Sequence, residues 1–259
     1  MTDVVRDKWL FFTEPLEGGV PCLYTDMRQT VEHPNGIVTV AFGNALFTPS
    51  AAAALPLMHA GGVPATAAEK IAAWQTVHDN PTARVKGWRY AATLTTIRLT
   101  REGMAELALA KYDSNDRILR ARCPDWDDLP AMAQCALHSL AWACGANAHF
   151  PRLFTTVNAR DFDRAAIEIH INEWTPEGTH NAGLVPRNLA NKTLMLNASR
   201  VQAYHLDPDT LNWTSLIGVQ DAPTLPDLSA SIEEYDRTPT SYVDVIEGRP
   251  IKGPPDDAA

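Results

Sequence analysis

The stretch EGGVPCLYTD, Glu17–Asp26, and the stretch GIVTVAFG, Gly36–Gly43, organise the rest of the chain. The second stretch follows Asn35-Gly36, a dipeptide typical of tight hairpin turns, and its β-branched residues are typical of a returning strand. These residues predict a small antiparallel sheet with Asp26 and Thr39 on or near it. The alternative is an ordinary hairpin with an exposed aspartate and a strand threonine.

A short amphipathic helix is predicted before this sheet. Residues 3–14 alternate apolar and charged side chains at helical spacing, and Pro15 should end or kink the helix at Glu14. Gly18 and Gly19 supply the backbone freedom that follows a helix C-terminus. Glu17 is therefore expected at an element boundary. A glutamate at such a place is usually a solvated surface residue.

The most apolar helix is predicted further along the chain. Asp128-Leu129-Pro130 begins it, Gly145 ends it, and the residues between are apolar or small nearly all round. Such a helix lies at the centre of a bundle. Thr100 is a plausible N-cap of a long helix before it, and Thr66-x-x-Glu69 has the pattern of a capping box. The expected fold class is α+β, with a small lobe carrying the hairpin and a larger helical lobe around residues 129–144.

Composition limits the class of protein. The chain has 259 residues, 45% of them hydrophobic, and a net charge of −9 with a pI near 5.3. These values are typical of a globular protein and argue against a general nucleic-acid binder, which needs a basic face. No segment has the apolar length of a membrane span. Charges within residues 1–12 interrupt the apolar core of a signal peptide, so we expect synthesis in the cytoplasm.

The cysteines do not have the spacing of a metal site. Neither a C-x-x-C pair nor zinc-finger spacing occurs, and Cys135 and Cys144 lie about 13 Å apart if they share a helix. Buried free thiols are therefore expected, with no metal and no cofactor. The four residues are Cys22, Cys123, Cys135 and Cys144.

The pattern E-G-x-x-x-x-x-Y-x-D, followed by a threonine and a glycine in G-I-V-T-V-A-F-G, resembles the phage-type lysozymes, the muramidase family of phage endolysins. The resemblance implies that Glu17 is the general acid, that Asp26 positions or activates water, and that the Thr39 hydroxyl completes the triad. Hydrolysis of a glycosidic bond needs one protonated and one ionised carboxyl group, and Glu17 and Asp26 supply such a pair. The resemblance also implies substrate contacts for Tyr24, Asn44 and Arg187.

Three later segments resemble the same family in the same order, so the likeness spans residues 9–205. Leu99–Leu107 matches the start of the family's long helix, Ala136–Ser139 with Gly145 matches its buried central helix, and Gly183–Asn188 matches G-L-x-x-R-R. The chain departs from the family at Ala41 (for Gly), Asn44 (for His), Ala143 (for a polar residue), Asn188 (for Arg) and Asn191 (for Glu).

The predicted organisation is a catalytic domain over 1–206 and a proline-rich extension over 207–259. Within the domain we predict a small lobe over 1–98, with an added segment at 45–98, and a helical lobe over 99–206. The added segment carries a basic and aromatic cluster that fits a glycan or an anionic wall polymer, although solvated arginines around partly buried rings are as common. The cluster consists of Arg84, Lys86, Arg89 and Arg98 around Trp88 and Tyr90. Because His138 lies on the predicted central helix, we expect it to be a core residue.

The expected activity is hydrolysis of the β-1,4 bond between N-acetylmuramic acid and N-acetylglucosamine in peptidoglycan. The alternatives are a lytic transglycosylase and a non-catalytic wall-binding or structural module. A chain made in the cytoplasm that acts on periplasmic peptidoglycan fits a phage lysis enzyme or an antibacterial toxin delivered by a secretion system such as type VI. The toxin would have a cognate immunity protein as a partner.

Overall fold

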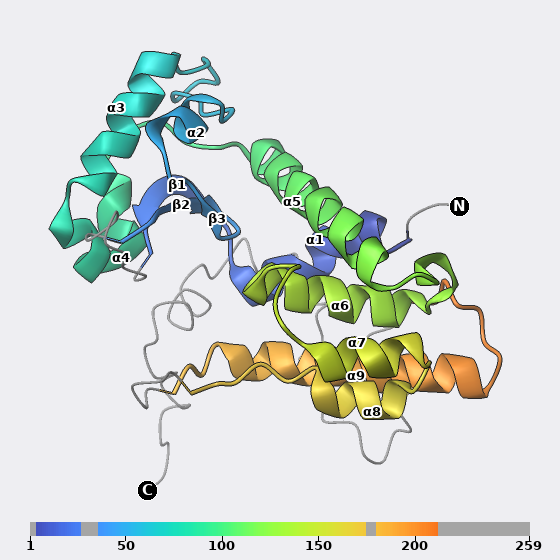
Figure 1. Cartoon of the computed structure of the whole chain (residues 1–259). Coiled ribbons are helices and arrows are strands. Elements are labelled where there is room, and N and C mark those ends of the chain that lie inside the picture. Colours follow the sequence, from blue (N-terminus) through green and yellow to red (C-terminus); the bar gives the residue numbers. More distant parts are fainter. Residues whose placement is uncertain (1–3, 27–35, 175–179, 212–259) are drawn as a thin grey trace, which may run out of the picture. The chain divides into compact units, whose positions relative to one another are not determined.

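The computed structural model describes residues 4–26, 36–174 and 180–211 (Figure 1). In these ranges the protein is α+β and mostly helical, with one three-stranded antiparallel sheet, which confirms the expected class. The predicted turn at Asn35 and the part of the extension after residue 211 lie outside them. The chain forms two compact units: Glu17–Ala110 makes one, and Met1–Leu16 with Lys111–Ala259 makes the other. We call them the sheet unit and the helical unit.

The sheet unit contains the predicted hairpin. Its strands are β1 (Val20–Thr25), β2 (Val38–Ala41) and β3 (Asn44–Ala45), in the order β1-β2-β3. Tyr24 lies opposite Thr39, and Thr25 lies opposite Val38. All four residues of β2 are buried, as the apolar sequence of this central strand requires.

Three helices belong to the segment between the sheet and residue 98. They are α2 (Pro49–Ala53), α3 (Ala67–His78) and α4 (Pro81–Leu94). The predicted capping box before α3 is present, since Thr66 and Glu69 each accept from the other's backbone N–H. Helix α4 packs on β1, and α3 packs on α2 and β1. The segment therefore covers the sheet with helices.

Two helices continue from one unit into the other. Helix α1 (Val4–Glu17) runs through Pro15, so of the two predicted outcomes, an end or a kink at Glu14, the end is wrong. Pro15 lies in the last turn of α1, and Gly18, at φ 65°, follows the end of the helix. Helix α5 (Arg101–Arg122) begins with the predicted cap, because the Thr100 hydroxyl accepts from the N–H of Gly103 at 3.0 Å. The unit boundary falls within α5, after Ala110, whereas the sequence placed it after residue 98.

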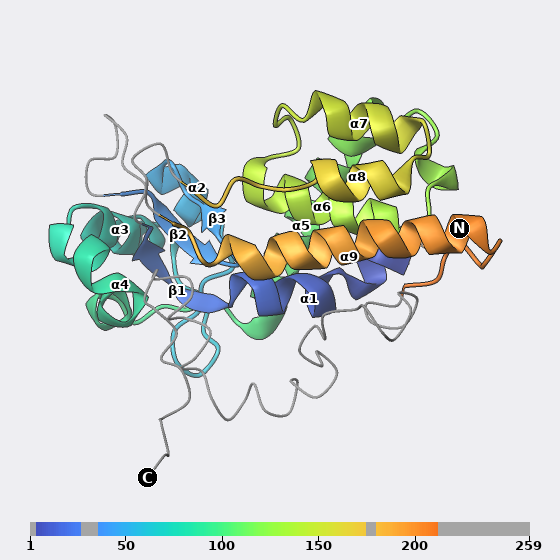
Figure 2. The same cartoon turned by 90° about the horizontal axis from the view of Figure 1, so that it is seen from below.

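The helical unit is built on α6 (Ala131–Cys144), which is buried along most of its length and confirms the predicted central helix. A 3₁₀ turn (Trp126–Asp128) precedes it, and α7 (Pro151–Asn158), α8 (Phe162–Glu168) and α9 (Leu184–Ala203) follow. Helix α9 packs on both α6 and α8, and α7 packs on α8 (Figure 2).

Helix α8 ends at Glu168, and the segment after it continues towards α9. The Asn188 side chain accepts from the N–H of Ile171 at 2.9 Å and donates to the carbonyl of Ile171 at 2.8 Å. These bonds satisfy the backbone of Ile171 outside a helix. Asn188 is therefore a structural residue that fixes the segment after α8 to α9.

His138 belongs to the core of the helical unit, as predicted. It is completely buried, its Nε2 lies 3.2 Å from Oδ1 of Asp116, and its ring stacks on Tyr112 with centroids 3.7 Å apart. Trp9 and Trp126 also contact the imidazole ring. The four cysteines are free thiols, and only Cys144 is exposed. None of the helices in the described ranges has both the length and the apolar character needed to cross a bilayer.

Candidate active site

Glu17 is the last residue of α1 and the first residue of the sheet unit. A Cβ added to Gly43 would lie 3.7 Å from Oε2 of Glu17 and would meet no other side chain or remote backbone within 4 Å. The Glu17 carboxyl group therefore lies against the turn that joins β2 to β3. The side chain is half-buried, because the helix end brings it onto this turn.

Asp26 and Thr39 lie on the β1–β2 ladder. The N–H of Asp26 donates to the carbonyl of Ile37 at 3.0 Å, which extends the pairing one step beyond β1. Because Tyr24 is opposite Thr39, and because alternate residues of a strand share a face, Asp26 and Thr39 are diagonal neighbours on one face. Diagonal neighbours stand roughly 7 Å apart. Tyr24 belongs to the same face.

The Thr39 hydroxyl already has a backbone partner. It donates to the carbonyl of Ile37 at 3.0 Å, and the side chain is 1% exposed. Its single proton is used in this bond, so towards a water molecule or a substrate it acts only as an acceptor.

The turn after Thr39 keeps the left-handed geometry that a glycine would adopt. Ala41 has φ 54° and Gly43 has φ 80°, and Ala41 stands where the lysozyme pattern has its first glycine. A left-handed alanine is strained by roughly 1–2 kcal/mol. The left-handed backbone at Ala41 therefore has an energetic cost that a glycine would not have.

Asn44 begins β3, directly after Gly43. Its side-chain oxygen Oδ1 is buried and accepts no hydrogen bond from any group in the part of the chain that the structure describes. A buried acceptor without a donor costs roughly 1–3 kcal/mol, so a bound water or a substrate hydroxyl or amide would satisfy it. Asn44 lies opposite Val40 of β2, so its predicted contact with substrate stays a prediction.

Arg187 belongs to the helical unit and is 3% exposed. Its Nη1 donates to the carbonyl of Ser139 at 2.9 Å and lies 3.1 Å from the Ser139 hydroxyl, which joins α9 to α6. These contacts have a structural role. A contact of Arg187 with substrate stays a prediction. Of the other predicted residues, Tyr24, Asp26 and Thr39 share one face of the β1–β2 ladder, Glu17 lies against the Gly43 turn, and Asn44 pairs with Val40 and so lies on the opposite face from Thr39.

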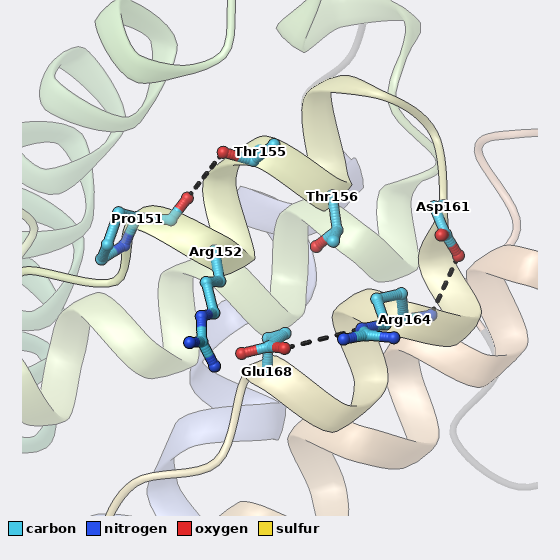
Figure 3. A pocket seen from close by; sticks show the side chains of 7 residues that line it. All are labelled: Pro151, Arg152, Thr155, Thr156, Asp161, Arg164 and Glu168. Carbon is cyan, nitrogen blue, oxygen red and sulfur yellow. Dashed lines mark hydrogen bonds and ion pairs between the residues drawn. The ribbon is translucent and has the colours of Figure 1, made fainter.

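An open cavity of about 420 Å³, which the sequence did not predict, lies between α7 and α8 of the helical unit (Figure 3). Arg164 lies 3.6 Å from Glu168, and its N–H donates to Asp161 at 3.0 Å. The Thr155 hydroxyl donates to the carbonyl of Pro151. The polar groups here mainly satisfy one another, and no signal in the local sequence distinguishes the cavity from an ordinary helix–helix junction. Its lining residues are Pro151, Arg152, Thr155, Thr156, Asp161, Arg164 and Glu168.

No group of three histidine, cysteine or carboxylate side chains within residues 4–26, 36–174 and 180–211 is placed to hold a metal ion. No protein-family model, no curated protein and no solved structure matches the chain. The candidate chemistry of the site therefore depends on Glu17, Asp26, Thr39 and their surroundings alone.

Proposed function

We propose that the protein is a peptidoglycan hydrolase that cleaves the β-1,4 bond between N-acetylmuramic acid and N-acetylglucosamine. The observation that carries the proposal is the position of the Glu17 carboxyl group against the β2–β3 turn, 3.7 Å from the Cβ position of Gly43. The same hairpin holds Asp26 and Thr39 on one face. The carboxyl groups of Glu17, at the end of α1, and Asp26, directly after β1, thus have different surroundings within one unit.

Glu17 is the general acid in this mechanism. It lies at the C-terminus of α1, where the negative end of the helix dipole disfavours an ionised carboxylate. Partial burial acts in the same direction. Both effects favour the protonated form, which gives its proton to the glycosidic oxygen as the bond breaks.

Asp26 is the carboxylate that binds and deprotonates the attacking water. It follows the end of β1 and is half-buried, so it stays in contact with solvent. The Thr39 hydroxyl can accept a hydrogen bond from the same water, since its own proton is donated to the carbonyl of Ile37. Inversion at the sugar carbon requires the carboxyl groups of Glu17 and Asp26 to stand roughly 6.5–9.5 Å apart when the substrate is bound.

The test is Glu17→Gln, with Glu106→Gln as the matched control on the exposed surface of the same unit. Wild type and E106Q should clear a suspension of purified sacculi and release reducing ends, whereas E17Q should do neither. Circular dichroism should show the same folded state for all three proteins. Clearing by E17Q at the wild-type rate would remove Glu17 from the acid role.

A second candidate activity is that of a lytic transglycosylase, which uses one glutamate as acid and base and forms anhydro-muramic ends. The burial of Thr39, which is 1% exposed, favours this candidate, because it limits the access of a catalytic water to the Thr39 hydroxyl. Mass spectrometry of the released fragments separates the two. Hydrolysis adds one water for each bond that is cleaved, whereas the transglycosylase reaction adds none, so its anhydro-muramic ends are lighter by one water.

The route to the substrate is part of the proposal. Delivery as an antibacterial toxin, or action as a phage lysis enzyme, would bring the protein to periplasmic peptidoglycan. A cognate immunity protein would then bind over the face of the hairpin that carries Asp26.

A further inference from the structure

Helix α4 and the residues after it form a positively charged segment in an acidic protein. Between Pro81 and Arg98 the sequence has four basic residues and no acidic residue, whereas the whole chain has a net charge of −9. The sheet unit as a whole, Glu17–Ala110, has seven basic and seven acidic residues. Four of the seven basic residues of this unit thus lie within residues 81–98, where no acidic residue occurs.

The backbone of α4 is broken at Gly87, which has φ 72° and ψ −169°. Lys86 and Arg89 lie on the two sides of the break, and both side chains are exposed. The Lys86 ammonium lies 5.2 Å from the centroid of the Tyr90 ring, and the Arg89 guanidinium lies 5.3 Å from the Trp88 ring. We call these four residues the α4 surface.

The two cations have no carboxylate partner in the described part of the chain. Neither Lys86 nor Arg89 takes part in an ion pair there. Arg98 differs, because its guanidinium donates to the carbonyls of Ala92 and Ile97 and so holds the end of α4. The charges of Lys86 and Arg89 are therefore available to a ligand, and that of Arg98 is used by the fold.

The α4 surface is attached to the strand that leads to the candidate site. Helix α4 packs on β1, and the Cys22 thiol lies 3.9 Å from the carbonyl oxygen of Trp88. From Cys22 to Asp26 the strand advances about 13 Å. A chain of a few linked sugars is long enough to contact both places.

We propose that the α4 surface binds the acidic stem peptides of a peptidoglycan strand. Their carboxylates pair with Lys86 and Arg89, and the half-buried rings of Trp88 and Tyr90 contact the neighbouring sugar or peptide. Peptidoglycan fits this surface because its glycan carries peptides with carboxylates. These carboxylates complement the two cations that lie beside aromatic rings. The inference rests on the proposed function, since it names the part of the substrate that this surface recognises.

Binding should be measured with Glu17→Gln as the background, so that the substrate is not consumed. The variant K86Q/R89Q removes the two cations, and K192Q/R200Q removes an exposed lysine and arginine from α9 as the matched control. At low salt, K86Q/R89Q should co-sediment with purified sacculi roughly threefold to thirtyfold more weakly than the background protein. The control should bind like the background protein, and high salt should abolish the difference.

Glycan strands from which an amidase has removed the peptides separate this inference from the activity. K86Q/R89Q with Glu17 intact should cleave the stripped strands at the wild-type rate and intact sacculi more slowly. Two outcomes in the Glu17→Gln background would overturn the inference: equal binding to intact sacculi with and without K86Q/R89Q, or binding of the background protein to stripped strands as tight as to sacculi. If wild type cleaves neither substrate but binds sacculi through Lys86 and Arg89, the proposed activity is wrong and the inference that the α4 surface binds stem peptides is supported.

Discussion

A methyl group placed on Gly36 would stand 2.2 Å from the carbonyl oxygen of Asp26 and 2.7 Å from Cγ2 of Thr25. The backbone of β1 thus passes directly against Gly36, which itself has φ 93°. The next residue accepts the hydrogen bond that holds the Asp26 backbone, from Asp26 N–H to the Ile37 carbonyl at 3.0 Å. The position of the candidate base therefore depends on the absence of a side chain at Gly36.

Gly36→Ala should destabilise the sheet unit by more than the roughly 1–2 kcal/mol that left-handed alanine costs by itself. The excess arises because a backbone oxygen cannot move away as the end of a flexible side chain can. Urea unfolding gives the free energy, and thiol labelling of Cys22 reports opening of β1. Burial raises the pKa of the Cys22 thiol, so the folded protein should react slowly.

Gly61→Ala is the matched control for this prediction. Gly61 also has a left-handed φ, 85°, but an added Cβ there would meet nothing within 4 Å. The two variants share the conformational cost and differ only in the clash with Asp26. Equal free energies of unfolding for G36A and G61A would show that the close approach at Gly36 has no energetic consequence.

Ala41→Gly should change the free energy of unfolding by less than about 1 kcal/mol. The substitution relieves the backbone strain of a φ of 54°. This gain offsets the loss of a buried methyl group, which contributes about 0.8 kcal/mol. Ala136→Gly is the comparison, since it removes an equally buried methyl group from regular helix α6. That variant has no strain to relieve and should lose about 2 kcal/mol. Similar losses in both variants would mean that Ala41 is unstrained.

Local sequence patterns predicted the elements of this fold well. The apolar run around α6, the capping box at Thr66 and the N-cap at Thr100 each use residues within one or two turns of helix, and each is present. The β-branched run after Gly36 likewise became β2. These features depend on short-range geometry, which short sequence patterns predict.

Contacts between distant residues were not predictable in the same way. Asn188 was noted only as a departure from a family pattern, yet its side chain bonds to the backbone of Ile171 after α8. The contact of Glu17 with the Gly43 turn and the buried hydrogen bond of Thr39 also depend on how elements pack. The motif resemblance named candidate site residues, but their surroundings depend on tertiary structure.

Asp26→Asn should lower the rate of hydrolysis by about 10²-fold or more, because an amide cannot accept the proton of the attacking water. The fold should be unchanged, since the bond to the Ile37 carbonyl uses the backbone N–H of Asp26. Release of reducing ends from purified sacculi measures the rate. Asp79→Asn, at the exposed C-terminal end of α3, should behave like wild type. A fully active D26N that releases anhydro-muramic products would favour the transglycosylase candidate.

Glu69 couples the start of α3 to pH. Its carboxylate accepts from the N–H and the hydroxyl of Thr66, both at 2.7 Å, and Oε1 lies 3.3 Å from Nε2 of His59. These hydrogen bonds lower the pKa of Glu69 from 4.5 to about 2. A pKa that is lower in the folded than in the unfolded protein stabilises the fold above the unfolded value, and this stabilisation is lost as pH falls from about 4.5 to about 2.

Glu69→Gln should therefore flatten the acid side of the stability curve between about pH 5 and pH 2, since glutamine does not titrate. Urea midpoints measured at several pH values in this window give the comparison with wild type. At neutral pH the variant keeps an acceptor for the Thr66 N–H but loses the charged hydrogen bonds, so it should be less stable there and approach wild type near pH 2. Glu106→Gln, on the exposed face of α5, should keep the wild-type decline. Parallel curves for E69Q and wild type would show that the hydrogen bonds from Thr66 and His59 do not stabilise the ionised carboxylate.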